Sequence, residues 1–233
     1  MDPITSAPDY AAARSNMVDS QVRPNKVTDP RVLDAMRALP REEFVPPALS
    51  PVAYVDEDLP LGGGRVLMEP MVIARLVQLA RVRPGERALV IGAGTGYGAA
   101  LVAACGAEVT ALDDDEALLA IALRVLPRYA PAVKIVHGAL SAGLPEGAPW
   151  DFILLEGAVT AIPPALAARS SPAAGWSRWW RRRDWADGRC WPSRPERPRR
   201  PGCARAKRSI ATPRCCRACA PPLRSCFSDL FRL

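Results

Sequence analysis

Short apolar runs alternate with helix-like segments between residues 84 and 168. The apolar runs cover residues 88–91, 108–112, 133–136 and 151–155, and each has the length and composition of a buried strand. The segments at residues 97–105 and 115–126 carry apolar positions at helical spacing, and a further helix is expected over residues 163–168. Strands and helices that alternate at this pitch predict βαβ units and a parallel sheet in an α/β fold.

The first 82 residues show helical patterns around one long irregular segment. Helices are predicted over residues 10–22, 30–39 and 70–82, and the second opens with a capping residue, Asp29, directly before Pro30. Residues 40–66 are rich in Pro, Gly and acidic residues, which predicts a long loop. We therefore expect three parts: N-terminal helices with a loop in residues 1–82, an α/β core in residues 83–168, and a separate tail in residues 169–233.

The tail differs from the rest of the chain in pattern and in charge. From Arg169 onward the hydrophobic periodicity stops, and Arg, Pro, Trp and Cys dominate. Residues 169–233 carry a net charge of +13, whereas residues 1–168 carry −6. Because the tail supplies no convincing strand, we expect the sheet to be incomplete after its fourth strand, with residues 151–155 as a bare apolar edge. We expect the tail itself to be poorly ordered.

Three interpretations of this tail are open. Its basic and aromatic residues suit a nucleic-acid-binding arm. Cys215, Cys216 and Cys219 suggest a zinc site, but their spacing is poor and no histidine accompanies them. The third interpretation is a shifted reading frame, because Trp and Cys codons both begin with TG and a shift of one base turns each into an apolar codon. The third explains most of the composition, so nucleic-acid binding is not our expectation.

The remaining totals describe a protein of the cell interior. Residues 1–25 lack the apolar segment of a signal peptide, and no apolar run reaches the roughly 18 residues of a membrane span. Cys105 is the single cysteine before residue 169 and is expected in the core. His137 is the only histidine, so a histidine-based metal cluster or catalytic triad is excluded. We expect a cytoplasmic protein without a metal site.

A glycine-rich turn follows the first predicted strand of the core. Gly92, Gly94 and Gly96 form a G-x-G-x-G motif between strand and helix, where a tight turn and a close approach of ligand to backbone require small residues. Asp113 lies 17 residues after Gly96, at the end of the next predicted strand. A carboxylate at this position can accept hydrogen bonds from both hydroxyl groups of a ribose. The G-x-G-x-x-G spacing of dinucleotide-binding enzymes is absent. The motif therefore favours S-adenosylmethionine over a dinucleotide, with an ordinary glycine-rich turn as the alternative.

Several motifs in a fixed order resemble the protein-L-isoaspartate O-methyltransferase family over residues 16–168. They are MVDSQVR at 17–23, VTDPRVLDAM at 27–36, PREEFVP at 40–46 and AYVDEDLP at 53–60. The resemblance implies a Rossmann-like methyltransferase fold with an N-terminal helical extension. It also implies S-adenosyl-L-methionine as the cofactor, protein repair as the role, and proteins or peptides with isoaspartyl residues as substrates.

The resemblance also implies site residues. Asp113 would bind the ribose, and the HGA segment at 137–139 would contact the adenine. The implied cofactor-binding residues are Gly92, Ala93, Gly94, Gly96, Tyr97, Asp113, Asp114, Gly138 and Ala139. The remaining acids of the 113–116 cluster are interpreted as helix-start residues. The implied substrate loop contains Gly64, Arg65, Val66, Met68 and Glu69.

This substrate loop departs from the family pattern. Val66 and Met68 stand where the family carries Thr and Ser, and neither side chain can donate a hydrogen bond to a substrate carboxylate. Glu69 adds a negative charge there, which Arg65 compensates only if its side chain turns inward. Methyl transfer depends mainly on positioning a reactive donor, so no catalytic base is assigned. A methyltransferase acting on isoaspartyl groups and a cofactor-binding homologue without that activity both remain open.

Overall fold

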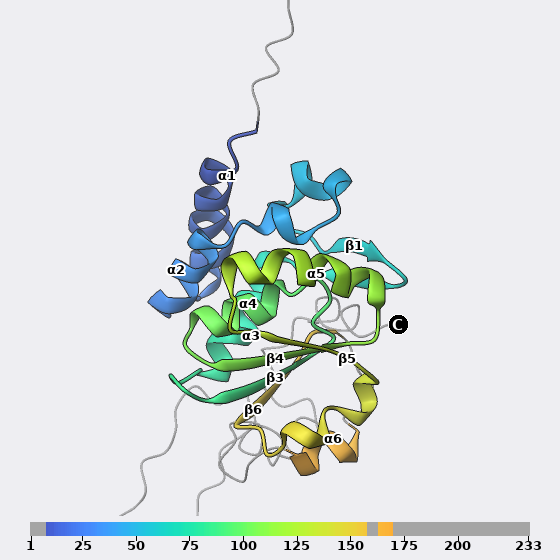
Figure 1. The fold of residues 1–233 in the computed structure, drawn as a ribbon. Helices are drawn as coiled ribbons and strands as arrows, with labels where there is room; N and C mark the ends of the chain where they lie inside the picture. The colour runs from blue at the N-terminus through green and yellow to red at the C-terminus, as the bar shows by residue number, and fades with distance from the viewer. Residues whose placement is uncertain (1–7, 158–162, 170–233) are drawn as a thin grey trace, which may run out of the picture. The chain divides into compact units, whose positions relative to one another are not determined.

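A four-stranded parallel sheet forms the centre of the protein (Figure 1). The computed structural model describes residues 8–157 and 163–169. The strands are β3 (Arg87–Ile91), β4 (Glu108–Asp113), β5 (Lys134–His137) and β6 (Phe152–Leu155), in the order β5-β4-β3-β6 with every neighbouring pair parallel. The four strands predicted from the apolar runs are confirmed to within one residue at each end, and so is the Rossmann-like α/β fold.

Successive side chains of β3 bury into two separate apolar clusters. Ala88 and Val90 belong to the large cluster, on the side of the sheet covered by α3 (Pro70–Ala80), α4 (Tyr97–Ala104) and α5 (Glu116–Tyr129) (Figure 1). Leu89 and Ile91 face the opposite side, where they pack with Leu166 of α6 (Pro164–Arg169). Because both faces of β3 are buried, its sequence is a continuous apolar run rather than an alternating one.

The predicted helix starts are confirmed by their capping bonds. Asp115 caps α5 by accepting the backbone N–H groups of Ala117 and Leu118 at 2.9 and 3.1 Å. Asp29 caps α2 (Pro30–Ala38) by accepting the N–H of Arg31 at 3.0 Å. These bonds satisfy donors that the first turn of a helix leaves unpaired. The helix α5 runs three residues beyond its predicted end, through Pro127 to Tyr129.

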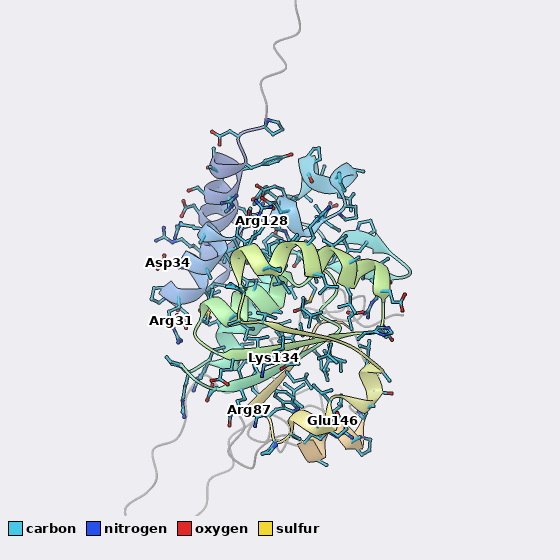
Figure 2. The ribbon with its side chains drawn as sticks, viewed as in Figure 1. Arg31, Asp34, Arg87, Arg128, Lys134 and Glu146 are labelled. Atoms are coloured by element: carbon cyan, nitrogen blue, oxygen red, sulfur yellow. The ribbon has the colours of Figure 1, made fainter. Side chains whose placement is uncertain are left out.

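The N-terminal helices share the core of the sheet. Helix α1 (Tyr10–Met17) continues into a π turn (Val18–Val22) and a short 3₁₀ turn (Arg23–Asn25) before α2 begins. Met17 and Val32 lie in the same apolar cluster as Ala88 and Val90. Charged side chains such as Arg31 and Asp34 lie on the outer side of α2 (Figure 2). The predicted boundary near residue 82 therefore crosses one continuous core.

The predicted loop over residues 40–66 is wrong in part. It contains two 3₁₀ helices (Arg41–Phe44 and Pro47–Val52) and an antiparallel hairpin of β1 (Leu59–Gly62) and β2 (Arg65–Leu67). Leu59 and Leu67 anchor the hairpin in the core at 4% and 5% exposure. The strands are too short for an alternating pattern, and the glycines between them resemble those of an irregular loop, so the sequence concealed the hairpin.

The predictions made for the tail, including its disorder, the nucleic-acid arm, the zinc site and the shifted frame, lie outside the described residues. Within residues 8–157 and 163–169, no helix is long and apolar enough to cross a membrane.

Candidate functional site

The turn between β3 and α4 requires glycine at each motif position. Gly92, Gly94 and Gly96 have φ angles of +73°, +55° and +92°, a region that residues with a side chain rarely adopt. A Cβ on Gly92 would also lie 2.7 Å from the backbone oxygen of Glu156. The turn therefore carries no side chain at these three positions, and at Gly92 the missing Cβ makes room for the chain where it leaves β6.

Asp113 links this turn to the carboxyl end of β4. Its side chain is fully buried. Its carboxylate accepts hydrogen bonds from the backbone N–H groups of Gly94, at 2.7 Å, and Asp115, at 2.9 Å. Its backbone oxygen accepts the N–H of Gly138 at 2.9 Å, just after β5 ends at His137, with Ala139 next along the chain. The structure thus brings together the ends of β3, β4 and β5, which carry nearly all the predicted cofactor residues.

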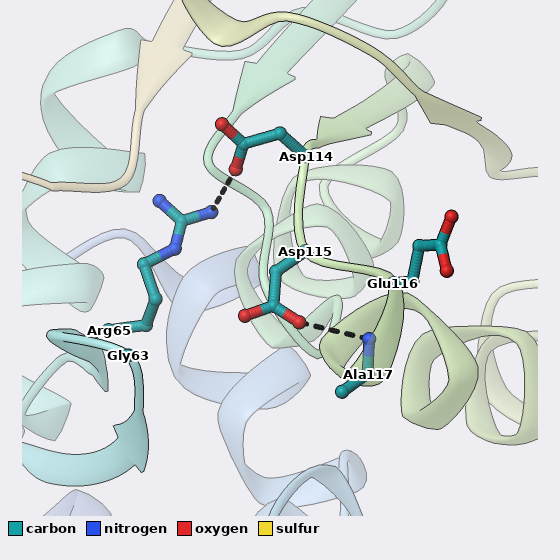
Figure 3. Close-up of a pocket in the computed structure, with 6 residues that line it drawn as sticks. All are labelled: Gly63, Arg65, Asp114, Asp115, Glu116 and Ala117. Atoms are coloured by element: carbon teal, nitrogen blue, oxygen red, sulfur yellow. Dashed lines mark hydrogen bonds and ion pairs between the residues drawn. The ribbon is translucent and has the colours of Figure 1, made fainter.

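A cavity of about 590 Å³ opens beside these strand ends (Figure 3). It is lined by Gly63, Arg65, Asp114, Asp115, Glu116 and Ala117. Asp114 is 55% exposed at its side chain, so its carboxylate is accessible from this cavity. The volume is in the range of small-molecule sites. A bare glycine turn, a buried carboxylate at the next strand end and an adjoining cavity fit a nucleoside-containing cofactor.

The side chain of Tyr97 takes no part in this surface. It is 1% exposed and packs edge-on against Phe44, with ring centroids 5.3 Å apart, and under the Arg41 guanidinium at 5.0 Å. Any contact between Tyr97 and a cofactor would therefore come from its backbone. The sequence could not separate these possibilities, because a tyrosine directly after the glycine turn can face either the ligand or the core.

The hairpin carries the predicted substrate loop to the cavity. Arg65 turns inward, as its compensating role required, but its Nη2 atom pairs with Asp113 and lies 3.5 Å from Asp114 Oδ1 (Figure 3). Val66 is 44% exposed, whereas Met68 packs partly against the core. Burial, together with the charges of Asp56 and Asp58, raises the pKa of Glu69.

Arg41, which sequence reasoning did not single out, fixes the end of this loop. It is fully buried, and it donates from Nε to the backbone oxygen of Ala53 and from Nη2 to that of Met68, each at 2.7 Å. Its planar fork therefore joins two backbone segments that are 15 positions apart in the chain. Its place in the motif at 40–46 was the only available signal.

Glu156 is a second residue that sequence reasoning missed. It directly follows β6, and its buried Oε1 atom has no hydrogen-bond partner among the described residues. Burial, with a smaller contribution from Asp113, raises the pKa of Glu156 from its ordinary 4.5 to about 8, while Arg41 and Arg65 act in the opposite direction. The order β5-β4-β3-β6 reverses between β3 and β6, so Glu156 lies at the point where open α/β sheets bind ligands.

Comparison with known proteins decides the family. The family model for protein-L-isoaspartate(D-aspartate) O-methyltransferase matches residues 12–172. The chain belongs to this family. The protein-L-isoaspartate O-methyltransferase of Methylorubrum extorquens (strain PA1) is 43% identical over 165 residues, which cover 71% of this chain and 72% of that protein. That of Koribacter versatilis (strain Ellin345) is 39% identical over 158 residues, which cover 67% and 71%.

Solved structures agree with this assignment. A protein-L-isoaspartate O-methyltransferase structure is similar with a TM-score of 0.59 and 26% identity, covering 68% of this chain and 52% of that one. A Plasmodium falciparum structure, described as a putative protein-L-isoaspartate O-methyltransferase in complex with S-adenosyl-L-homocysteine, has a TM-score of 0.57 and covers 68% of this chain and 79% of that one. At 19% sequence identity, this similarity supports the fold of the chain and not its activity. This family member is an enzyme, an O-methyltransferase that depends on S-adenosyl-L-methionine. The glycine motif predicted the cofactor, and the family resemblance implied the O-methyl transfer.

Proposed function

We propose that this methyltransferase esterifies the free carboxylate of isoaspartyl residues in damaged proteins or peptides. The names of its relatives carry that activity. The observation that supports it in this chain is the position of the hairpin tip. Gly63 and Arg65 line the same cavity as Asp114 and Asp115, so the segment implied to bind the substrate meets the segment implied to bind the cofactor.

The cofactor half of the site rests on backbone and one carboxylate. Gly92, Gly94 and Gly96 would leave room for the methionine part, and Asp113 would accept the ribose hydroxyls. Asp114 and the Gly138–Ala139 backbone would flank the nucleoside. When bound, the cofactor supplies an electrophilic methyl group on a sulfonium. The protein needs to hold this group and the acceptor oxygen in line and to exclude water from between them.

The acceptor half needs no general base. A substrate carboxylate is already ionised at neutral pH, so its oxygen is nucleophilic without losing a proton. The obstacle is electrostatic, because Glu69 and Glu156 are both acidic. Burial raises the pKa of Glu156 to about 8, which favours its neutral, protonated form near pH 7 and reduces the repulsion that a second carboxylate would meet. The pKa of Glu69 is also raised, by burial and by the nearby charges of Asp56 and Asp58. A protonated carboxyl group can also donate a hydrogen bond to a substrate carboxylate, as the absent hydroxyls at positions 66 and 68 would.

The test compares two peptides of one sequence, with isoaspartyl or ordinary aspartyl linkage at a single position. Incubation with methyl-labelled cofactor should give alkali-labile label on the isoaspartyl peptide and none on its isomer. Label that resists alkali, or cofactor binding without any transfer to the isoaspartyl peptide, would contradict the proposal.

A further inference from the structure

Arg65 connects the hairpin with the cofactor half of the site. Its Nη2 atom pairs with the buried carboxylate of Asp113 and lies 3.5 Å from Asp114 Oδ1, while its own side chain is 24% exposed. A Cβ on Gly92 would lie 3.7 Å from its Nη1 atom. The guanidinium therefore lies beside Gly92 of the glycine turn, and Figure 3 shows it directed toward Asp114 at the end of β4.

This pairing uses the carboxylate that the ribose needs. Oδ2 of Asp113 accepts the Gly94 N–H, and Oδ1 accepts the Asp115 N–H as well as Arg65. A carboxylate has about four acceptor positions, and three of them are taken. Two ribose hydroxyls cannot both bind there while Arg65 stays in place. The cofactor and Arg65 are competitors for Asp113.

The hairpin has the freedom to release this contact. Gly62, Gly63 and Gly64 all have positive φ angles, and a Cβ on Gly62 or Gly64 would meet no atom within 4 Å. The nearest neighbour of Gly63 is Asp115 Oδ2, 3.8 Å from where its Cβ would be. Strands β1 and β2 pair only with each other within the described residues. Leu59, Leu61 and Leu67 pack the strands of the hairpin against the core, whereas the glycine tip makes no such contact, and beside it the Arg65 ion pair ties the hairpin to Asp113.

The released guanidinium suits the acceptor. Arg65 is the only basic residue between positions 59 and 69, and the two hydroxyl positions of the family loop are Val66 and Met68. Arginine binds carboxylates through two parallel N–H donors. These donors can make the hydrogen bonds to the substrate carboxylate that hydroxyl groups at positions 66 and 68 would otherwise make.

We propose that Arg65 exchanges one carboxylate for another: it pairs with Asp113 before the methyl donor binds, and it then binds the carboxylate of the methyl acceptor. The second step rests on the function proposed above. The exchange makes donor and acceptor binding mutually favourable, because each ligand favours the released state of the hairpin, and this coupling is reciprocal.

The test for the first step is calorimetric titration with S-adenosyl-L-homocysteine, which cannot transfer a methyl group. Arg65→Gln should bind it about threefold or more tightly than the wild type, since no ion pair has to break first. Arg65→Lys, which keeps the charge without the fork, should lie between them. Arg75→Gln is the matched control, because Arg75 is exposed on α3 and makes no ion pair with any described residue. Equal or weaker binding by Arg65→Gln would overturn the proposal, and thermal unfolding checks that each variant is folded.

The test for the second step adds the isoaspartyl peptide. In the wild type, saturating S-adenosyl-L-homocysteine should tighten peptide binding about tenfold, and Arg65→Gln should abolish this gain while Arg75→Gln keeps it. A wild type that methylates the peptide without showing the gain would overturn the exchange and leave the proposed function intact. If the wild type neither binds nor methylates the peptide, the proposed function and the second step are both refuted. The titration with S-adenosyl-L-homocysteine still tests the first step, the release of Arg65 from Asp113.

Discussion

The absent side chain of Gly98 leaves the space that the carboxyl group of Glu156 occupies. A Cβ at position 98 would overlap with Glu156 Oε1 and lie 2.9 Å from Oε2. Gly98 is the second residue of α4, and its φ is not positive, so its backbone does not require glycine. The glycine is therefore needed because of Glu156, which directly follows β6 at the point where the strand order reverses.

This relationship predicts strong coupling between the two positions. Gly98→Ala should destabilise the wild type by about 1 kcal/mol, because the buried carboxyl group must move. In a protein that carries Glu156→Ala, the same Gly98→Ala change should stabilise the fold by up to about 1 kcal/mol, since alanine is a better helix former than glycine. Urea unfolding of the four proteins completes the cycle. Additive effects would show that the two residues do not share this space.

The raised pKa of Glu156 predicts a specific dependence of stability on pH. The folded protein holds the proton up to about pH 8, whereas the unfolded chain releases it near pH 4.5. The stabilising effect is therefore complete below pH 4.5 and is lost as the pH rises through about 8. Over this window the free energy of unfolding should fall with rising pH, by at most about 1.4 kcal/mol per pH unit.

Glu156→Gln isolates this contribution, because glutamine keeps the shape and cannot titrate. Asp113, Arg41 and Arg65, which shift the Glu156 pKa, stay in place in the variant. The difference in unfolding free energy between Glu156→Gln and the wild type should grow in favour of the variant from pH 5 to pH 8 in urea titrations. Parallel pH profiles would contradict a raised pKa.

Gly96 should tolerate substitution less well than Gly64. Both have positive φ angles, so alanine costs each about 1–2 kcal/mol of backbone strain. At Gly96 the new Cβ would also lie 2.8 Å from Leu126 Cδ1 and 3.1 Å from its Cγ, in a side chain that is 1% exposed. This overpacking should add about 1–3 kcal/mol. Thermal or urea unfolding of the two variants tests this prediction. Equal losses of stability in Gly96→Ala and Gly64→Ala would show that Leu126 moves aside freely.

Asp113→Asn should weaken S-adenosyl-L-homocysteine binding at least about tenfold. The amide replaces one acceptor oxygen by a donor, so the side chain can no longer accept hydrogen bonds from both ribose hydroxyls. The same change can leave the buried N–H of Gly94 or Asp115 without its partner. Asp34→Asn is the control, since that side chain is 78% exposed on α2 (Figure 2). Titration calorimetry at a temperature where both variants are folded measures the effect. Binding by Asp113→Asn within twofold of the wild type would remove Asp113 from the cofactor site.

The sequence by itself determined the strands, most helices and the glycine turn between β3 and α4. The run 88–91 is apolar at every position because both faces of β3 are buried, and this is a local signal. The glycines at 92, 94 and 96 reveal a turn that no other residue adopts easily. Asp113 was found by its distance along the chain, because one strand–helix–strand unit sets that spacing.

Only the tertiary structure decided how the polar groups of the site are paired. Arg65 and Asp113 are 48 positions apart, and nothing in the local pattern shows that a glycine hairpin, concealed in a presumed loop, brings them together. Glu156 reaches Gly98 because β6 lies beside β3 and not beside β5. Apolar periodicity reports which faces are buried but not which strands are neighbours. The partners of buried charges depend on that order, and so they emerge only when the sheet is assembled.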